Sequence, residues 1–337
     1  MNKPQYHYYQ SDTDKLLSEI NNDALIADLK KMLLIRNFET RAESAYQQGK
    51  IGGFYHAYTG QEAIQTAAMR VMGDQNWWTT TYRCHALALL LGVTPNEAMA
   101  ELYGKVTGNA KGRGGSMHFY HEKMLGGFGI VGGHIPVAAG AAFALNYLGQ
   151  ENLASICFLG DGAVAQGAFH ETLNLASLWD LPCIFVVENN HWGMGTAVSR
   201  AISLEPIAES MAPAYKMKSY TLDGMDYFNC YAGFKEIYEE VKKTKRPVIV
   251  EVITERFKGH SVSDPGLYRS KEDLKKEMER DPIFLLKNTL ILNNCLTEDK
   301  FKEYDKEQRE IVIQSMKFAE ESPFPDPATL EEGVLEE

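Results

Sequence analysis

The stretch from residue 153 to residue 194 constrains the fold most, because it alternates strand-like and helix-like patterns. Two short apolar runs, residues 153–159 and 183–187, flank a segment in which Phe169, Leu173 and Ala176 recur at near-helical spacing. Bounded apolar runs predict buried strands, and the spacing between them predicts a helix. A crossover of this length suits two parallel strands. We therefore expect an α/β fold with a doubly wound, mostly parallel sheet and helices on both faces.

Polar residues follow both expected strands. Asp161 stands between Gly160 and Gly162 after the first strand, and Asn190 lies just past the second. In an open α/β sheet the carboxyl ends of the strands face the ligand crevice, so the two side chains should meet there. A carboxylate and an amide oxygen suit Mg²⁺ shared with a phosphate. We expect a helix to open at Ala163 and to favour an anion at its N-terminus. Alone, Gly-Asp-Gly is equally compatible with a simple turn.

Several spaced blocks carry a resemblance to a known family. Gly160-Asp161-Gly162 followed by Asn189-Asn190 resembles the thiamine diphosphate motif. The wider pattern is similar to the 2-oxo acid dehydrogenase alpha family, in particular the alpha subunit of the pyruvate dehydrogenase component. It spans about residues 30–320, with blocks at residues 113–118, 129–132, 188–195 and 259–265.

The resemblance implies a thiamine-diphosphate-binding fold and a set of site residues. It implies Mg²⁺ ligands at the side chains of Asp161 and Asn190 and the backbone oxygen of Trp192. Tyr82 and Arg83 would hold the diphosphate, for which an arginine fork is well suited. It further implies cofactor contacts at Gly129, Val131, Gly162, Ala163, Met194 and His260.

The histidines differ in how strongly the sequence indicates a catalytic role. His56 lies in a glycine- and aromatic-rich loop, where a histidine is a candidate for proton chemistry. The resemblance makes His56 and His260 the expected catalytic pair, for proton transfer or substrate orientation. We expect His85 to be a helix cap or a packed core histidine. For His118, a structural role and a place at the pocket are equally compatible with the sequence. Whether Ser261, which matches a regulated serine, is phosphorylated stays open.

The same resemblance implies oxidative decarboxylation of pyruvate and transfer of the acetyl group to a lipoyl domain of the complex. Acetoin and branched-chain 2-oxo acid dehydrogenase alpha subunits are the alternatives. Only one doubly wound unit is apparent. We therefore expect a beta subunit to supply the activating glutamate within an alpha2-beta2 heterotetramer that works with a dihydrolipoyl acyltransferase core.

A rival of another class is a non-catalytic module that binds a phosphate ligand. Neither a Gly-x-x-x-x-Gly-Lys-Ser/Thr loop nor a strand-linked Gly-x-Gly-x-x-Gly is present to favour it. Thiamine diphosphate binding would distinguish this module from the enzyme.

Charge and composition limit the partners and the compartment. The net charge is −11, from 45 acidic and 34 basic residues, which argues against a nucleic acid partner. No apolar run has the length of a membrane span, and no signal or transit pattern opens the chain. The five cysteines form no Cys-x-x-Cys pair, which favours a reducing, cytoplasmic setting.

Three segments are expected along the chain. Residues 1–22 read as a flexible arm, residues 23–320 as a single thiamine-diphosphate-binding α/β domain with helical extensions, and residues 321–337 as an extended acidic tail. A long amphipathic helix is expected over residues 23–48, with Glu39 on its solvated face.

Overall fold

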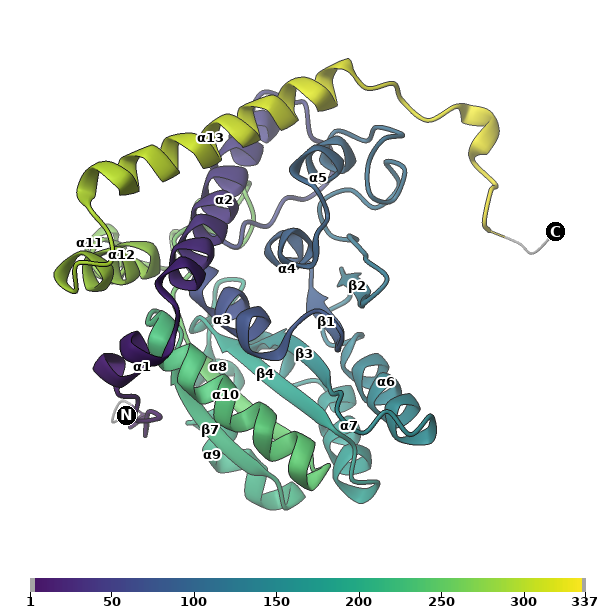
Figure 1. Cartoon of the computed structure of the whole chain (residues 1–337). Coiled ribbons are helices and arrows are strands. Elements are labelled where there is room, and N and C mark those ends of the chain that lie inside the picture. Colours follow the sequence, from purple (N-terminus) through teal and green to yellow (C-terminus); the bar gives the residue numbers. More distant parts are fainter. Residues whose placement is uncertain (1–3, 335–337) are drawn as a thin grey trace.

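A parallel sheet forms the centre of the molecule (Figure 1). The computed structural model describes residues 4–334. Within that range the main sheet has six strands in the order β2-β1-β3-β4-β8-β7, all paired in parallel. The strands are β1 (Trp77–Thr81), β2 (Met124–Phe128), β3 (Ser155–Gly160), β4 (Cys183–Asn189), β7 (Lys218–Asp223) and β8 (Val248–Ile253). A short antiparallel pair, β5 (Trp192–Gly193) and β6 (Thr196–Ala197), lies just beyond β4.

Alternate residues of the central strands enter two separate hydrophobic cores. Ile156 and Phe158 of β3 join the larger core, whereas Cys157 and Leu159 join the smaller one. This division follows from the two-residue period of a strand, and burial on both faces explains the continuous apolar runs. The expected doubly wound α/β fold is thereby confirmed.

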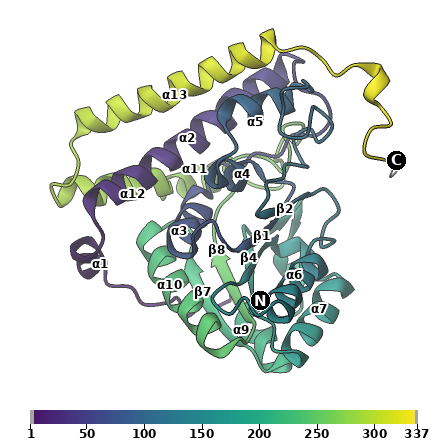
Figure 2. The same cartoon turned by 45° about the vertical axis from the view of Figure 1, so that its right-hand side comes forward.

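Helices cover both faces of the sheet (Figures 1 and 2). On the side of the larger core lie α2 (Asn22–Gln47), α3 (Glu62–Met72), α4 (His85–Leu91), α5 (Pro95–Leu102) and α10 (Tyr227–Thr244). On the other side lie α6 (Ile135–Tyr147), α7 (Gly167–Leu178), α8 (Val198–Ala201) and α9 (Ile207–Met211). The remaining helical segments are α1 (Thr13–Glu19), α11 (Lys271–Met278), α12 (Pro282–Leu292), α13 (Glu298–Glu321) and the 3₁₀ turns η1 (Asp161–Ala163), η2 (Ala212–Tyr215) and η3 (Pro327–Thr329).

The two ends of the chain lie on its surface. In the arm, α1 precedes α2, and the backbone N–H of Tyr9 donates to the carbonyl of Thr221 in the edge strand β7. The long helix α13 runs beside α2, and the chain after it extends away from the body (Figure 2). The three-segment division stays a prediction, and residues 1–3 and 335–337 of the arm and tail lie outside the described residues.

Two expectations about local structure are wrong. The α-helix after β3 begins at Gly167 rather than at Ala163, because residues 161–163 form a 3₁₀ turn first. Glu39 does not lie on a solvated face of α2: it is fully buried, because a loop and a histidine pack over it.

Membrane insertion through a helix finds no support in the described chain. None of its helices has both the length and the apolarity that a bilayer crossing requires.

Candidate active site

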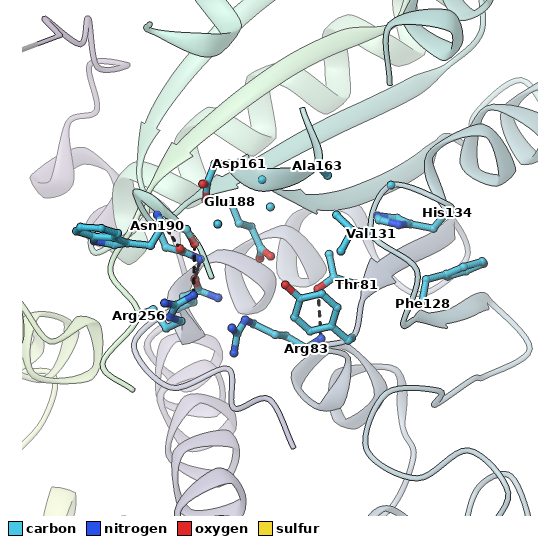
Figure 3. A pocket seen from close by; sticks show the side chains of 17 residues that line it. Thr81, Arg83, Phe128, Val131, His134, Asp161, Ala163, Glu188, Asn190 and Arg256 are labelled. Carbon is cyan, nitrogen blue, oxygen red and sulfur yellow. Dashed lines mark hydrogen bonds between the residues drawn. The ribbon is translucent and has the colours of Figure 1, made fainter. Parts of the chain in front are cut away.

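Two adjoining cavities open at the carboxyl ends of the central strands. The inner cavity is lined by residues at the ends of β1, β2, β3 and β4, in the loops after these strands and after β8, and at the start of α3. Figure 3 draws these residues: Gln61, Thr81, Tyr82, Arg83, Phe128, Val131, Gly132, His134, Gly160, Asp161, Gly162, Ala163, Glu188, Asn190, Trp192, Gly193 and Arg256. The outer cavity shares Tyr82 and Val131 with it and is lined further by Phe54, His56, Met117, Gly129, Met194, Gly195, His260, Ser261, Ser263, Asp264 and Tyr268. Every site residue expected from the sequence lines one of these two cavities.

Oxygen atoms from two strand ends gather in the inner cavity. Asp161 follows β3 and is buried, and burial raises the pKa of its carboxyl to about 6. Asn190 follows β4, and its amide nitrogen donates to Gln61 Oε1 at 3.2 Å. This bond orients the amide, and its Oδ1 faces the backbone N–H of Trp192 at 3.4 Å. Among residues 4–334 no cluster of three or more His, Cys, Asp or Glu side chains suits a metal, so a cation here would depend on mixed oxygen ligands.

Two arginines complete the inner cavity. Arg83 is 4% exposed and Arg256 is 2% exposed, and in the described chain neither has a carboxylate within ion-pair distance. Arg83 donates to the carbonyls of Ala57 at 2.6 Å and His260 at 2.7 Å. Burial, and next the neighbouring Arg83, lower the pKa of Arg256 to about 10. Because buried charges are normally paired, this arrangement calls for an anionic ligand.

Arg256 also joins two loops at the cavity wall. Its guanidinium donates to the carbonyl of Trp192 at 3.4 Å and to that of Met194 at 3.2 Å, and it also bonds the Tyr268 hydroxyl. In Figure 3 Arg83 and Arg256 lie near each other, facing the side chains of Asp161 and Asn190. Met194 itself is exposed, in a left-handed backbone conformation with φ of 54°.

The two glycines around the end of β3, Gly160 and Gly162, leave the backbone accessible. A Cβ added at Gly160 would meet no atom within 4 Å, and one added at Gly162 would lie 3.3 Å from the Cα of Gly193. Backbone amides without side chains are accessible to a bulky anion such as a phosphate.

The outer cavity brings together the two expected catalytic histidines. The ring centroids of His56 and His260 are 5.0 Å apart, and Tyr82 lies 4.4 Å from His56. Burial, and next the charge of Arg83, lower the pKa of His56 to about 3 and of His260 to about 4. Both rings are therefore neutral near pH 7, and each has a buried Nδ1 with no hydrogen-bond partner in the described structure. Such nitrogens are free to bind a ligand or exchange a proton.

The two further histidines weighed from the sequence, His85 and His118, do not line either cavity. His85 is a packed core histidine, one of the two roles expected for it, bonded to Glu39 and Ser116. His118 is exposed, lines neither cavity and has its Nδ1 3.1 Å from the carbonyl of Gly114.

Two charged residues of the inner cavity were not singled out from the sequence. Glu188 is the penultimate residue of β4 and accepts a hydrogen bond from the Tyr58 hydroxyl, and burial raises the pKa of its carboxyl to about 7. Arg256 lies just before the 259–265 block, and no role for it was apparent from the sequence. The signal for both was adjacency, since Glu188 is two residues before Asn190 and Arg256 four before His260.

The residues present fit a magnesium-bound diphosphate. The inner cavity supplies a carboxylate with neutral oxygen donors for a hard cation, two arginines that have no carboxylate within ion-pair distance among residues 4–334, and open glycine backbone at Gly160 and Gly162.

A comparison with protein families defines the class of protein. The model of the Dehydrogenase E1 component family matches residues 30–328. The chain therefore belongs to this family, and the recognition made from the sequence is confirmed, together with its enzyme class: the family comprises thiamine diphosphate-dependent dehydrogenases.

Individual relatives narrow the comparison. The chain is 43% identical over 307 residues to the pyruvate dehydrogenase E1 component subunit alpha of Rickettsia felis, covering 90% of this chain and 94% of the relative. It is 40% identical over 322 residues to the protein of the same name from Rhizobium meliloti, covering 95% and 92%. The chloroplastic subunit alpha-3 of Arabidopsis thaliana is 40% identical over 311 residues, covering 90% of this chain and 72% of the relative.

Proposed function

We propose that this chain is the alpha subunit of a pyruvate dehydrogenase (acetyl-transferring) component. In that role it takes part in the oxidative decarboxylation of pyruvate and passes the acetyl group to a lipoyl domain. The observation that carries the proposal is one cavity at the carboxyl ends of the central strands that holds Asp161, Asn190 and two buried arginines without an ion-pair partner among the described residues. The names of the relatives support pyruvate as the substrate.

The inner cavity is the proposed diphosphate and Mg²⁺ site. Asp161, Asn190 Oδ1 and the carbonyl oxygen of Trp192 would hold the cation. Arg83 and Arg256 would neutralise the diphosphate, with Tyr82 beside it and Gly162 and Ala163 presenting their backbone. Gly129, Val131 and Met194, on the outer side, would contact the rest of the cofactor.

Thiamine diphosphate, when bound, supplies the carbanion that attacks a 2-oxo group and the electron sink for loss of CO₂. The chain contributes position and electrostatics. Arg83 ties the His56 loop and the His260 loop to the diphosphate side through two carbonyls. The neutral rings of His56 and His260 orient the substrate or hold a proton at Nδ1, in a cavity where burial disfavours charge on them.

The activating glutamate is proposed to come from a beta subunit in an alpha2-beta2 heterotetramer. That assembly would work with a dihydrolipoyl acyltransferase core, and a cytoplasmic location remains part of the same prediction. Thiamine-dependent decarboxylation by this chain in the absence of any partner would refute the split site.

The face formed by α6 and α7 is the proposed docking surface for that beta subunit. It exposes large apolar side chains around a groove: Val137, Phe143, Tyr147, Leu148, Leu175, Leu178 and Trp179. The helix α6 carries no charged residue and starts directly after His134 of the inner cavity, so a subunit docked here borders the cofactor site. Leu178→Asp should abolish copurification with the beta subunit, whereas Leu292→Asp, at another exposed leucine, should not.

The cofactor site is tested by removing its carboxylate. Asp161→Ala should abolish Mg²⁺-dependent thiamine diphosphate binding, measured by titration calorimetry, while circular dichroism stays unchanged. Asp299→Ala, at an exposed carboxylate on α13, is the control and should bind normally. Retained binding by Asp161→Ala at ordinary Mg²⁺ concentrations would reject the assignment.

The substrate is tested by a rate panel on the reconstituted complex. Pyruvate, acetoin and 3-methyl-2-oxobutanoate should be compared by kcat/KM. We expect pyruvate to be preferred, and preference for either of the others would move the chain to the acetoin or branched-chain enzymes.

A further inference from the structure

A buried carboxylate lies directly behind the loop that carries His56. Glu39 of α2 is 0% exposed. Its carboxylate accepts hydrogen bonds from the Tyr55 hydroxyl and from the backbone N–H of Tyr58, the latter at 3.0 Å. These two residues flank His56 in the sequence, so Glu39 binds the loop on both sides of the histidine.

The same carboxylate bonds a second buried side chain. His85 Nδ1 lies 3.1 Å and 3.2 Å from the two carboxylate oxygens of Glu39. Its Nε2 lies 2.9 Å from the Ser116 carbonyl oxygen and 3.0 Å from the Ser116 hydroxyl. Ser116 precedes Met117, which lines the outer cavity. His85 therefore links the His56 loop to the segment that carries Met117, another lining residue of that cavity.

The His56 loop is consequently held from two directions. Glu39 binds it from the side of α2. From the side of the inner cavity, the Arg83 guanidinium donates a hydrogen bond of 2.6 Å to the Ala57 carbonyl. The imidazole of His56 takes no part in these bonds, and its Nδ1 has no partner in the part of the chain that the structure describes. The loop is fixed through its neighbours while the functional ring is left free.

We propose that Glu39 is a positioning residue that sets the place of the His56 ring in the outer cavity. It acts through Tyr55 and Tyr58 on the loop and through His85 on the segment of Ser116 and Met117. The inference rests on the proposed function only in assigning His56 to the substrate side. A displaced histidine would slow the chemical step and leave the diphosphate site intact, because misplacing a reacting group by about 1 Å costs about 100-fold in rate.

Two substitutions separate position from charge, both in the complex with the beta subunit. Glu39→Ala removes all three bonds. Glu39→Gln keeps the shape: its oxygen still accepts from Tyr58 and His85, and its amide donates to the Tyr55 hydroxyl. Asp23→Ala, at an exposed carboxylate in the first turn of the same helix, is the matched control.

The kinetic readout is the division between kcat, substrate KM and cofactor affinity. We expect Glu39→Ala to lower kcat about 100-fold. The Kd for thiamine diphosphate, with Mg²⁺ present, should change less than about threefold, since no cofactor-site residue bonds Glu39. Glu39→Gln should recover kcat to within about fivefold of wild type, because two of its three contacts need only an oxygen acceptor.

A second readout does not depend on turnover. Diethyl pyrocarbonate modifies accessible neutral histidines, and peptide mass spectrometry reports each site. His56 is 6% exposed, so its carbethoxylation in the wild type should be slow. It should rise about tenfold or more in Glu39→Ala, because the loop loses its anchors, and return toward the wild-type rate in Glu39→Gln.

The outcomes distinguish this inference from the proposed function. Glu39→Ala with kcat and His56 modification within twofold of wild type would overturn it, as would joint loss of cofactor binding and kcat that Glu39→Gln does not restore. If Glu39→Ala does not fold, Tyr55→Phe removes one of the bonds and should show smaller shifts in the same direction; no shift overturns the inference. Failure of the proposed function would instead appear as absent cofactor binding by the wild type, and the modification rates would still test Glu39.

Discussion

A single carboxylate organises the glycine-rich loop beside the outer cavity. Glu101 of α5 is fully buried, and its two oxygens accept four backbone N–H groups. One oxygen bonds Gly114 at 2.7 Å and Gly115 at 3.1 Å, and the other bonds Ala110 at 2.7 Å and Gly112 at 2.9 Å. No Lys, Arg or His of residues 4–334 lies within ion-pair distance of it, so backbone dipoles alone stabilise the charge.

Glu101→Gln tests how much this arrangement contributes. The amide oxygen keeps one pair of bonds, but the NH₂ group replaces an acceptor with a donor facing two N–H donors. Hydrogen bonds to a charged group contribute about 1.5 kcal/mol or more each, so losing two costs about 3 kcal/mol. Because the loop is only half-buried, we expect this loss to appear as local opening of residues 110–115 rather than as global unfolding.

Native-state hydrogen exchange measures that opening residue by residue. About 3 kcal/mol corresponds to about 100-fold less protection at the four bonded amides. Glu97→Gln is the matched control, because Glu97 lies one turn earlier in α5 and bonds only its own helix start at Thr94. If a folded Glu101→Gln protein loses less than about threefold protection at these amides, the carboxylate does not hold the loop and the reasoning fails.

Three further predictions concern the inner cavity. Gly162→Ala places a methyl group 3.3 Å from the Cα of Gly193 and should weaken thiamine diphosphate binding about tenfold in calorimetry, with little change in melting temperature. Arg83→Lys cannot reach two carbonyls and a phosphate at once, so the cofactor Kd should rise about 10- to 100-fold, and an unchanged Kd would argue against the clamp. Burial lowers the pKa of His134 to about 4, below its unfolded value near 6.5, so its contribution to stability is complete above pH 6.5 and is lost as the pH falls toward 4. Urea unfolding should show that the wild type loses about 2 kcal/mol more than His134→Gln between pH 7.5 and pH 5.

The central strands could be predicted from the sequence because burial on both faces leaves a direct record. Every residue of β4 is buried, so the strand reads as an uninterrupted apolar run that ends in polar residues. The end of such a strand fixes where Asp161 and Asn190 stand, which is why spacing alone brought them to one crevice.

Other features left no such record. The strand β2 reads Met-Leu-Gly-Gly-Phe and lies at the sheet edge, so its two glycines hide the alternation that marks a strand. Glu39 shares its helix with partly exposed charged residues such as Lys31 and Arg41, and the loop folded over it makes it a buried acceptor. Its burial is a tertiary fact that helical periodicity does not encode.

The two buried glutamates, Glu39 and Glu101, hold the loops on which the outer cavity is built. The inner cavity is built on strand ends, which the sheet holds rigidly. The outer cavity is built on glycine-rich loops. These loops have few side chains that can pack, and they lose much conformational entropy when they become ordered. A carboxylate that accepts several backbone N–H groups orders such a loop without needing side chains from it. Glu101 does this for the loop of Met117, whereas Glu39 holds the His56 loop through one backbone N–H and the Tyr55 hydroxyl, and His85 connects the two loops. The substrate side of the site therefore depends on Glu39 of α2 and Glu101 of α5, which line neither cavity.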